Sequence, residues 1–191
     1  MAPRLAKRNA PKGPPRLSSR RRARTIGEMG RTADYSQQVC SVAATLEVVG
    51  DPWTLLILRD AFAGVRRFEQ WQEQLGVARN VLAARLRSLV EHGVLERRLY
   101  SERPPRWDYV LTAKGRDLRP VILALKAWGD RHVYGEAAGP LQILHSCGAE
   151  LTPKMVCADC GEPIRGRDLT SHRRPALTVG EALAGLSQPQ D

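Results

Sequence analysis

Four side chains in the last third of the chain have types and spacings that suit a metal ion. His145 and Cys147 are separated by one residue, and Cys157 and Cys160 are separated by two. Three thiolates and one imidazole suit tetrahedral zinc, and four protein ligands leave no open position for catalysis. A glycine follows Cys147 and Cys160, as in the tight turns that present such ligands. The sequence therefore predicts a structural zinc site in a zinc-ribbon-like module at residues 140–171.

Two other interpretations of these thiols stay open. Cys157 and Cys160 could form a redox-active pair, although the βαβ pattern expected around such a pair is absent. The thiols could also be unreactive, since the nine residues between Cys147 and Cys157 are fewer than in common zinc ribbons. Zinc is favoured because so short a segment has too few apolar residues to fold without a metal.

A fourth cysteine, Cys40, stands apart at the beginning of the first predicted helix. The positive end of a helix favours negative charge, and the thiolate is the reactive form of a cysteine. Cys40 is therefore either a reactive thiol or a partly buried side chain in an interface, and its position alone does not decide between them.

Arginines gather in one stretch of the chain. The net charge is +10, but residues 1–31 carry ten basic side chains and one acid, so the other 160 residues, with 20 basic and 19 acidic side chains, contribute only +1. Between Arg59 and Arg106 there are ten arginines and six acids. A nucleic-acid partner is therefore predicted from this local patch and not from the overall charge.

The two ends of the chain are predicted to be tails. Residues 1–34 are rich in Pro, Arg, Lys and Ser without apolar periodicity, which predicts a disordered basic tail. This tail could track DNA phosphates, could be only solvated, or could precede a true translation start at Met29. Residues 172–191 are predicted to be a flexible C-terminal tail.

Apolar periodicity predicts that a mainly helical domain at residues 35–135 positions the arginines. A first helix ends at residue 49, and a helix at 53–63 is apolar on most sides and so belongs in the centre of the domain. A short helix around Trp71 and a helix at 78–92 follow, with a glycine turn between them. Two helices joined by a tight turn are the signature of a helix-turn-helix.

A β-hairpin follows directly after this motif, which predicts a wing. Its strands are expected at residues 94–100 and 106–111, around a loop that contains Pro104. One long helix is predicted at 113–134, with an inward apolar face made of Leu118, Val121, Ile122, Leu125 and Trp128. The predicted fold class is mainly α with a small β wing, a winged helix-turn-helix, plus the small zinc-ribbon-like module.

Over residues 38–133 the sequence resembles the HxlR family of winged-helix regulators. The resemblance is carried by Cys40-Ser-Val-Ala, Gly50-Asp-Pro-Trp-Thr-Leu-Leu-Ile-Leu-Arg-Asp60, Leu82-Ala-Ala-Arg-Leu-Arg-Ser-Leu89, Gly93-Val-Leu-Glu-Arg-Arg98, Pro104-Pro105, Tyr109-Val-Leu-Thr112 and Lys114-Gly115. Where the family usually has Pro after the Cys, this chain has Ser41. The resemblance implies a homodimer built from the first and last helices of the domain. It also implies that Cys40 senses oxidants or small electrophiles such as quinones and aldehydes.

In a helix-turn-helix the second helix enters the major groove of DNA with its N-terminal residues leading. Base contacts are therefore expected from the exposed face of the 78–92 helix, a phosphate contact from its flank, and further contacts from the wing tip. The expected base-contacting residues are Arg79, Asn80, Ala83, Ala84 and Arg87. The expected phosphate contact is Arg85, and the wing-tip residues are Arg103 and Arg106. A dimer predicts an inverted-repeat operator.

The leading functional hypothesis is a sequence-specific DNA-binding transcriptional regulator, expected to be a repressor, with double-stranded DNA and a second copy of itself as partners. The alternative is a basic RNA- or ribosome-associated protein with a zinc ribbon. The ten aromatic residues offer few platforms for stacking bases, which argues against it. No catalytic triad, phosphate loop or acid pair predicts an enzyme. We expect a cytoplasmic protein without a membrane partner, because no apolar run approaches the ~18 residues of a span.

Overall fold

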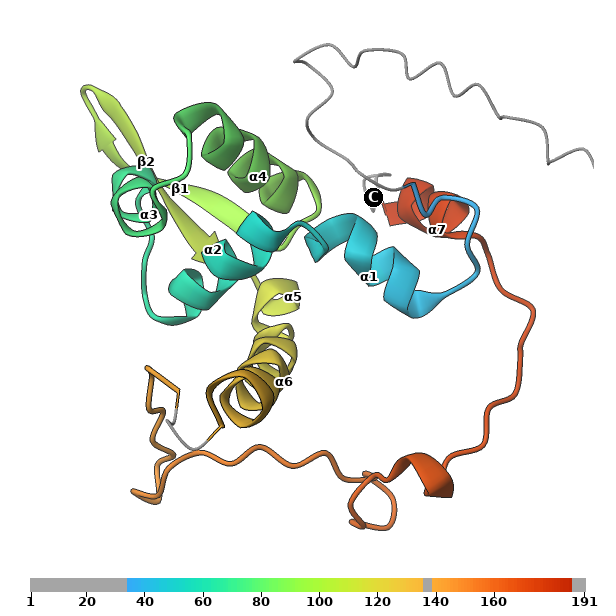
Figure 1. The fold of residues 1–191 in the computed structure, drawn as a ribbon. Coiled ribbons are helices and arrows are strands. Elements are labelled where there is room, and N and C mark those ends of the chain that lie inside the picture. Colours follow the sequence, from blue (N-terminus) through green and yellow to red (C-terminus); the bar gives the residue numbers. More distant parts are fainter. Residues whose placement is uncertain (1–33, 136–138, 187–191) are drawn as a thin grey trace, which may run out of the picture. The chain divides into compact units, whose positions relative to one another are not determined.

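The computed structural model describes residues 34–135 and 139–186, and every structural statement below refers to these residues. Two helices, the helix-turn-helix and the hairpin follow one another along the chain as predicted (Figure 1). The elements are α1 (Ser41–Val49), α2 (Pro52–Phe62), α3 (Phe68–Leu75), α4 (Arg79–Glu91), β1 (Leu95–Glu102), β2 (Pro105–Leu111), α5 (Ala113–Arg116), α6 (Arg119–Gly129), the π-helical turn η2 (Asp130–Tyr134), the 3-10 turn η4 (Gly166–Asp168) and α7 (Val179–Leu186).

The hydrophobic core is centred on α2, as its all-round apolar sequence predicts. Ile57 and Leu58 of α2 are fully buried, and so is Trp71 of α3. The Trp71 indole N–H donates a hydrogen bond of 3.2 Å to the Ile57 carbonyl oxygen, which satisfies a polar group inside the core. Each such side chain stabilises the fold by about 1.5–3 kcal/mol relative to an exposed one.

The helix-turn-helix comprises α3 and α4. Gly76 ends α3 with φ 61°, a left-handed conformation that glycine adopts without steric cost. Three leucines of α4 are fully buried against the core: Leu82, Leu86 and Leu89. Because all three lie on one face of the helix, the opposite face of α4 is left toward solvent.

The wing is the antiparallel pair β1 and β2, which extends away from the helices (Figure 1). The pairing runs from Leu95 opposite Leu111 to Glu102 opposite Pro105, with a register shift between Leu99 and Ser101. The strands are therefore longer than predicted, and only two residues separate them. The backbone N–H of Tyr109 donates to the carbonyl of Arg66 at 2.8 Å, which ties β2 to the residues just before α3.

The prediction of one long helix at residues 113–134 is wrong, because three elements occupy this stretch. α5 ends at Arg116, and α6 begins at Arg119 with Pro120 in its first turn. Proline lacks the N–H that a helix interior needs but is tolerated in a first turn, which explains why a new helix starts here. The π-helical turn η2 follows α6.

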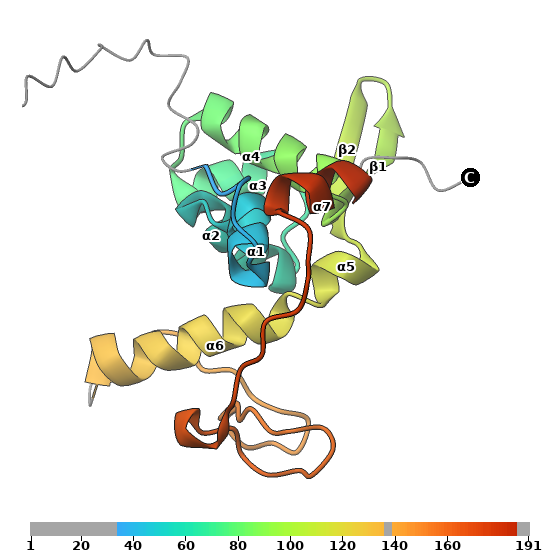
Figure 2. The same ribbon diagram turned by 90° about the vertical axis from the view of Figure 1, so that its right-hand side faces the viewer.

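The predicted flexible tail at residues 172–191 contains α7, which contacts α1 (Figure 2). The N–H groups of Val179 and Gly180 donate to the carbonyls of Gln38 and Ser36 at 2.8 and 2.9 Å, and Val179 is buried. This part of the prediction was wrong because a contact with the start of the domain, and not a local pattern, orders the segment. Residues 187–191, and the predicted basic tail up to residue 33 with Met29, lie outside the described residues.

No single helix among the described residues is long and apolar enough to cross a membrane. Helices α1 and α2 reach the required length and composition only when taken together, and they are bent by 78° at the break between them.

We predict that Gly115→Ala destabilises the domain by about 1–3 kcal/mol, the usual cost of overpacking. A Cβ atom at Gly115 would lie 2.1 Å from the carbonyl oxygen of Val94, which is backbone and cannot move aside. Urea unfolding followed by circular dichroism measures the effect. Gly129→Ala is the matched control, since a Cβ there has open space and alanine favours helix by up to about 1 kcal/mol. Equal stability of the two variants would contradict the packing described here.

Candidate nucleic-acid interface and cysteine pairs

The solvent face of α4 presents the five residues expected to contact bases. Arg79, Asn80, Ala84 and Arg87 are exposed and Ala83 is half-buried. The helical spacing places Asn80, Ala84 and Arg87 on the side of α4 opposite the buried leucines. Ala83 lies on the flank, and Arg79 is exposed in the first turn. The side chains on this face are cations, an amide and two methyl groups, which is a set that can pair with base edges.

The side chain of Arg79 is held in place by α3. Its Nη1 donates a 2.7 Å hydrogen bond to Oε1 of Gln72, and its guanidinium lies 5.0 Å from the ring centre of Phe68. Stacking of a guanidinium on an aromatic ring contributes about 0.5–1 kcal/mol at an exposed site. Arg79 is therefore oriented before any partner arrives.

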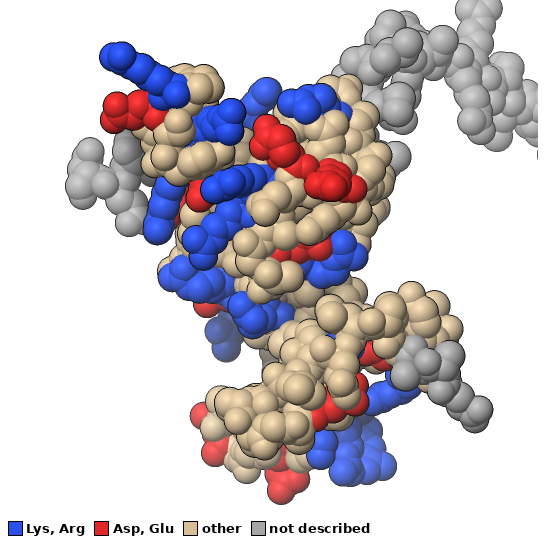
Figure 3. Space-filling view, turned by 90° about the vertical axis from the view of Figure 1, so that its left-hand side faces the viewer, with Lys and Arg blue, Asp and Glu red and all other residues tan. Residues whose placement is uncertain are grey.

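The wing tip presents Arg103 and Arg106, both exposed, as predicted from the hairpin. The Ser101 hydroxyl donates to the Pro104 carbonyl at 3.2 Å and closes the turn between them. Lys and Arg side chains gather over the side of the molecule that faces the viewer in Figure 3, with fewer acidic side chains among them.

Two further arginines beside the wing were missed by the sequence analysis. The guanidinium of Arg67 lies 4.6 Å from the ring centre of Tyr100, and that of Arg97 lies 4.4 Å from the ring centre of Trp107. Arg67 is also 3.5 Å from a carboxylate oxygen of Asp108. The presence of Arg97, Tyr100 and Trp107 in the two predicted strands could have indicated the stacking of Arg97, whereas Arg67 lies just before α3 and is brought to Tyr100 by tertiary contacts.

The structure does not support the phosphate contact expected of Arg85. Its Nη2 lies 2.8 Å from Oδ2 of Asp51, the residue that caps α2, and only 19% of its side chain is exposed. The guanidinium therefore faces the interior junction of helices and not the solvent side of α4. The local pattern could not show this, because Asp51 is 34 residues away in the chain.

The apolar face predicted for the last helix is divided in the structure. Leu118 and Ile122 pack against the core, but Val121, Leu125 and Trp128 are 42, 50 and 61% exposed. Helix α1 likewise exposes two large apolar side chains, Val42 and Leu46. The single chain therefore leaves apolar surface uncovered on the two helices at the ends of the domain.

Cys40 occupies the N-cap position of α1, as predicted. Its carbonyl accepts the first hydrogen bond of the helix from Ala44 at 2.9 Å, and no side-chain hydrogen bond caps the helix. The residue is exposed in the single chain, so a reactive thiol and a side chain in an interface both stay predictions.

The other three cysteines lie in two small hairpins. In the first, Leu144 bridges Glu150; in the second, Val156 bridges Pro163. Gly148 and Gly161, each directly after a cysteine, have φ of 86° and 74°. Only glycine adopts such turns readily, so the pattern of glycines that the sequence analysis singled out forms two tight turns.

Each hairpin brings two of the predicted zinc ligands together. In the first, Nδ1 of His145 lies 3.3 Å from Sγ of Cys147. In the second, the backbone N–H groups of Cys160 and Asp159 and a side-chain hydrogen bond with Cys160 lower the pKa of the Cys157 thiol. Within residues 34–135 and 139–186, no three His, Cys, Asp or Glu side chains lie close enough to hold a metal. The four predicted ligands thus form two pairs and not one set.

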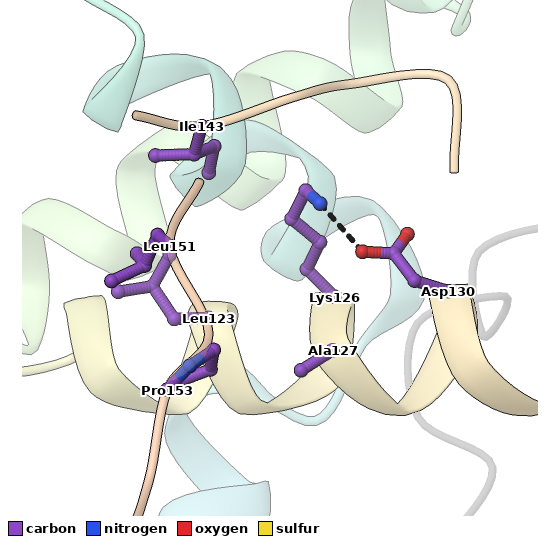
Figure 4. Close-up of a pocket in the computed structure, with 7 residues that line it drawn as sticks. All are labelled: Leu123, Lys126, Ala127, Asp130, Ile143, Leu151 and Pro153. Carbon is purple, nitrogen blue, oxygen red and sulfur yellow. Dashed lines mark hydrogen bonds and ion pairs between the residues drawn. The ribbon is translucent and has the colours of Figure 1, made fainter. Parts of the chain in front are cut away.

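The first hairpin contacts α6 around a small pocket (Figure 4). Leu123 and Ala127 of α6 line one side, and Ile143, Leu151 and Pro153 line the other. At the edge of the pocket the ammonium of Lys126 lies 2.5 Å from a carboxylate oxygen of Asp130, so the charges of the two side chains neutralise one another. This apolar contact attaches the start of the cysteine-containing segment to the winged-helix domain.

Comparison with known proteins gives matches to transcriptional regulators. The model of the HxlR-like helix-turn-helix family matches residues 48–137. The uncharacterized HTH-type transcriptional regulator Rv3095 of Mycobacterium tuberculosis is 46% identical over 138 residues, which is 72% of this chain and 87% of that protein. These 138 residues are more than the winged-helix domain contains, so the similarity extends outside it.

Two solved structures are also similar. PA1607, which is assigned as a transcription factor, is 37% identical with a TM-score of 0.65, and the match covers 73% of this chain and 99% of that one. PA1374 of Pseudomonas aeruginosa, assigned in the same way, is 39% identical with a TM-score of 0.52 and a coverage of 75% and 99%.

Proposed function

Because the chain belongs to the HxlR-like helix-turn-helix family of transcriptional regulators, and so is a DNA-binding protein and not an enzyme, we propose that it is a repressor. It acts in the cytoplasm as a homodimer on an inverted-repeat operator. The observation that carries this proposal is the exposed face of α4, where Asn80 and Arg87 lie opposite the buried leucines and Arg79 is exposed in the first turn.

These side chains suit the edges of bases in the major groove. Arginine pairs with two acceptors of guanine, and asparagine pairs with adenine. The methyl groups of Ala83 and Ala84 permit close approach and fit the methyl group of thymine. Each good bidentate pair contributes about 1–3 kcal/mol of discrimination against the wrong base.

The wing supplies the sequence-independent part of the binding. Arg103 and Arg106 are exposed at its tip, where phosphate or minor-groove contacts give affinity and fix the register of the protein. Arg97 on β1 and Arg67 just before α3 are stacked on aromatic rings of the wing and are further candidates for phosphate contacts.

A second copy of the chain is the proposed occupant of the apolar surface on α1 and α6. Val42, Leu125 and Trp128 are half exposed or more in the single chain. Burying such side chains between two copies contributes about 25 cal/mol per Å² of apolar surface. A symmetric dimer presents two copies of α4 to successive turns of the major groove, about 34 Å apart.

We predict that the protein prefers the DNA upstream of its own gene over a scrambled duplex, and that this preference survives ~200 mM salt. Asn80→Ala and Arg87→Ala should each weaken binding to the preferred DNA by about 1–3 kcal/mol and leave scrambled DNA nearly unaffected. Arg103→Ala and Arg106→Ala should weaken binding to both duplexes, because phosphates carry no sequence. Fluorescence anisotropy across a salt series measures both effects.

The exposed cation Lys154, outside the winged-helix domain, provides the matched control. Lys154→Ala should bind both duplexes like the wild type. Equal binding to the two duplexes that disappears with salt would show that only charge is recognised, and this would contradict sequence-specific regulation.

For the cysteine-containing segment we propose one structural zinc ion held by His145, Cys147, Cys157 and Cys160. Each hairpin already pairs two donors of the types zinc prefers. No residue between 139 and 178 is buried, so the segment lacks a core of its own. When bound, zinc would supply the cross-link that joins the two hairpins.

We predict one zinc ion per purified chain, measured by metal analysis of protein prepared without chelators. Cys157→Ser and Cys160→Ser should each lose the metal and speed proteolysis within residues 140–171, because the cross-link between the hairpins is gone. Cys40→Ser, the control, should keep both the metal and the resistance to proteolysis. A purified wild-type chain that contains no zinc, and whose residues 140–171 still resist proteolysis, would contradict the proposed site.

We also propose that Cys40 senses oxidants or small electrophiles. The thiol is exposed at the N-cap of α1, the helix whose apolar face is proposed to form the dimer. A covalent change at this point alters the start of that helix.

Treatment with a quinone or diamide should weaken operator binding by the wild type, and dithiothreitol should restore it after diamide. Cys40→Ser should bind the operator with the affinity of the wild type, and neither reagent should change that affinity. Loss of binding in treated Cys40→Ser would assign the response to another thiol.

A further inference from the structure

One carboxylate, that of Asp51, joins the recognition helix α4 to the start of α2. Its Oδ1 accepts a 2.9 Å hydrogen bond from the backbone N–H of Trp53, which caps α2, and its Oδ2 lies 2.8 Å from Nη2 of Arg85 on α4. Both side chains are largely removed from solvent, with 26% of Asp51 and 19% of Arg85 exposed. The ion pair therefore connects two helices that are far apart in the sequence.

The junction that carries Asp51 is sterically fixed relative to α1. The N–H of Gly50 donates to the Leu46 carbonyl at 2.8 Å, and a Cβ atom at Gly50 would lie 2.4 Å from that same oxygen. The chain then turns by 78° from α1 into α2. Asp51 is thus held at the junction between α2 and α1. Helix α1 exposes the apolar face proposed for the dimer.

Apolar packing alone does not fix the rotation of α4 relative to the α1–α2 junction. Leu82, Leu86 and Leu89 hold α4 against the core, but burial of apolar surface is not directional. A charge-assisted hydrogen bond has a preferred direction and length. The contact between Arg85 and Asp51 is a directional contact of this kind between α4 and the α1–α2 junction.

We propose that the Asp51–Arg85 ion pair sets the orientation of α4 relative to α1, and that it thereby determines which spacing of operator half-sites the dimer accepts. Arg85 is then a positioning residue and not a phosphate contact. The inference rests on the proposed function, because half-site spacing has a meaning only for a dimer that reads two half-sites. In a symmetric dimer the same rotation of α4 occurs in both copies. The distance between the two recognition helices therefore changes by twice the displacement in one copy.

The test compares Asp51→Asn, Arg85→Gln and the double variant. Asparagine is as good an N-cap as aspartate, so Asp51→Asn removes the charge and keeps the cap. The DNA probes are the best-bound duplex from the upstream region and copies whose centre is longer or shorter by one base pair. Affinities are measured over a salt series, well below the melting temperature of each variant.

We expect each single variant to weaken binding to the natural spacing by about tenfold, the size of one mismatched base pair. The double variant should be no weaker than the singles, because the pair acts as a unit. The slope of affinity against salt should stay unchanged, and the preference for the natural spacing should fall. Arg85→Lys keeps a positive charge in reach of Asp51 and should restore part of that preference.

Arg87→Ala is the matched control, since Arg87 is exposed two residues further along α4. It should weaken binding and keep the spacing preference. The proposal is overturned if Arg85→Gln lowers the salt slope by about one and Asp51→Asn changes nothing, because that is the behaviour of a phosphate contact. A wild-type protein that shows no preference among duplexes would overturn the proposed function, and this inference with it.

Discussion

The burial of one face of α4 is the interaction on which the rest of the structure depends. Leu82, Leu86 and Leu89 are fully buried against a core that contains Ile57 and Trp71. Because these leucines recur at helical spacing, the opposite face of α4, with Asn80, Ala84 and Arg87, is exposed to solvent.

Much of the winged-helix domain could be predicted from the sequence, since its signals are local. Gly76 at the end of α3 and the Asp51-Pro52 start of α2 each act within a few residues. The prediction failed in two places: it overlooked a proline that starts a new helix, and it could not include a contact between distant residues. Residues 113–134 break around Pro120, and α7 is ordered by Ser36 and Gln38 at the other end of the domain.

The residues of the candidate site were likewise predictable where local spacing decides, and not where tertiary contacts decide. Which residues of α4 face outward follows from periodicity, so Arg79, Asn80 and Arg87 were identified from the sequence. The environment of each arginine depends on tertiary contacts, and periodicity could not show that Arg85 turns toward Asp51. The cysteine hairpins are a local feature too: their glycine turns form from neighbouring residues, whereas a shared metal would have to bring the two hairpins together.

The central claim is that α4 reads bases as part of a symmetric dimer. Repeated selection of bound duplexes from a random double-stranded library tests it most directly, because no operator has to be known in advance. The account predicts an enriched inverted repeat whose half-sites lie about one helical turn apart, or a multiple of that, and whose guanine and adenine positions lose their enrichment with Arg87→Ala or Asn80→Ala. A pool without an enriched sequence, or a single unrepeated half-site, would contradict it.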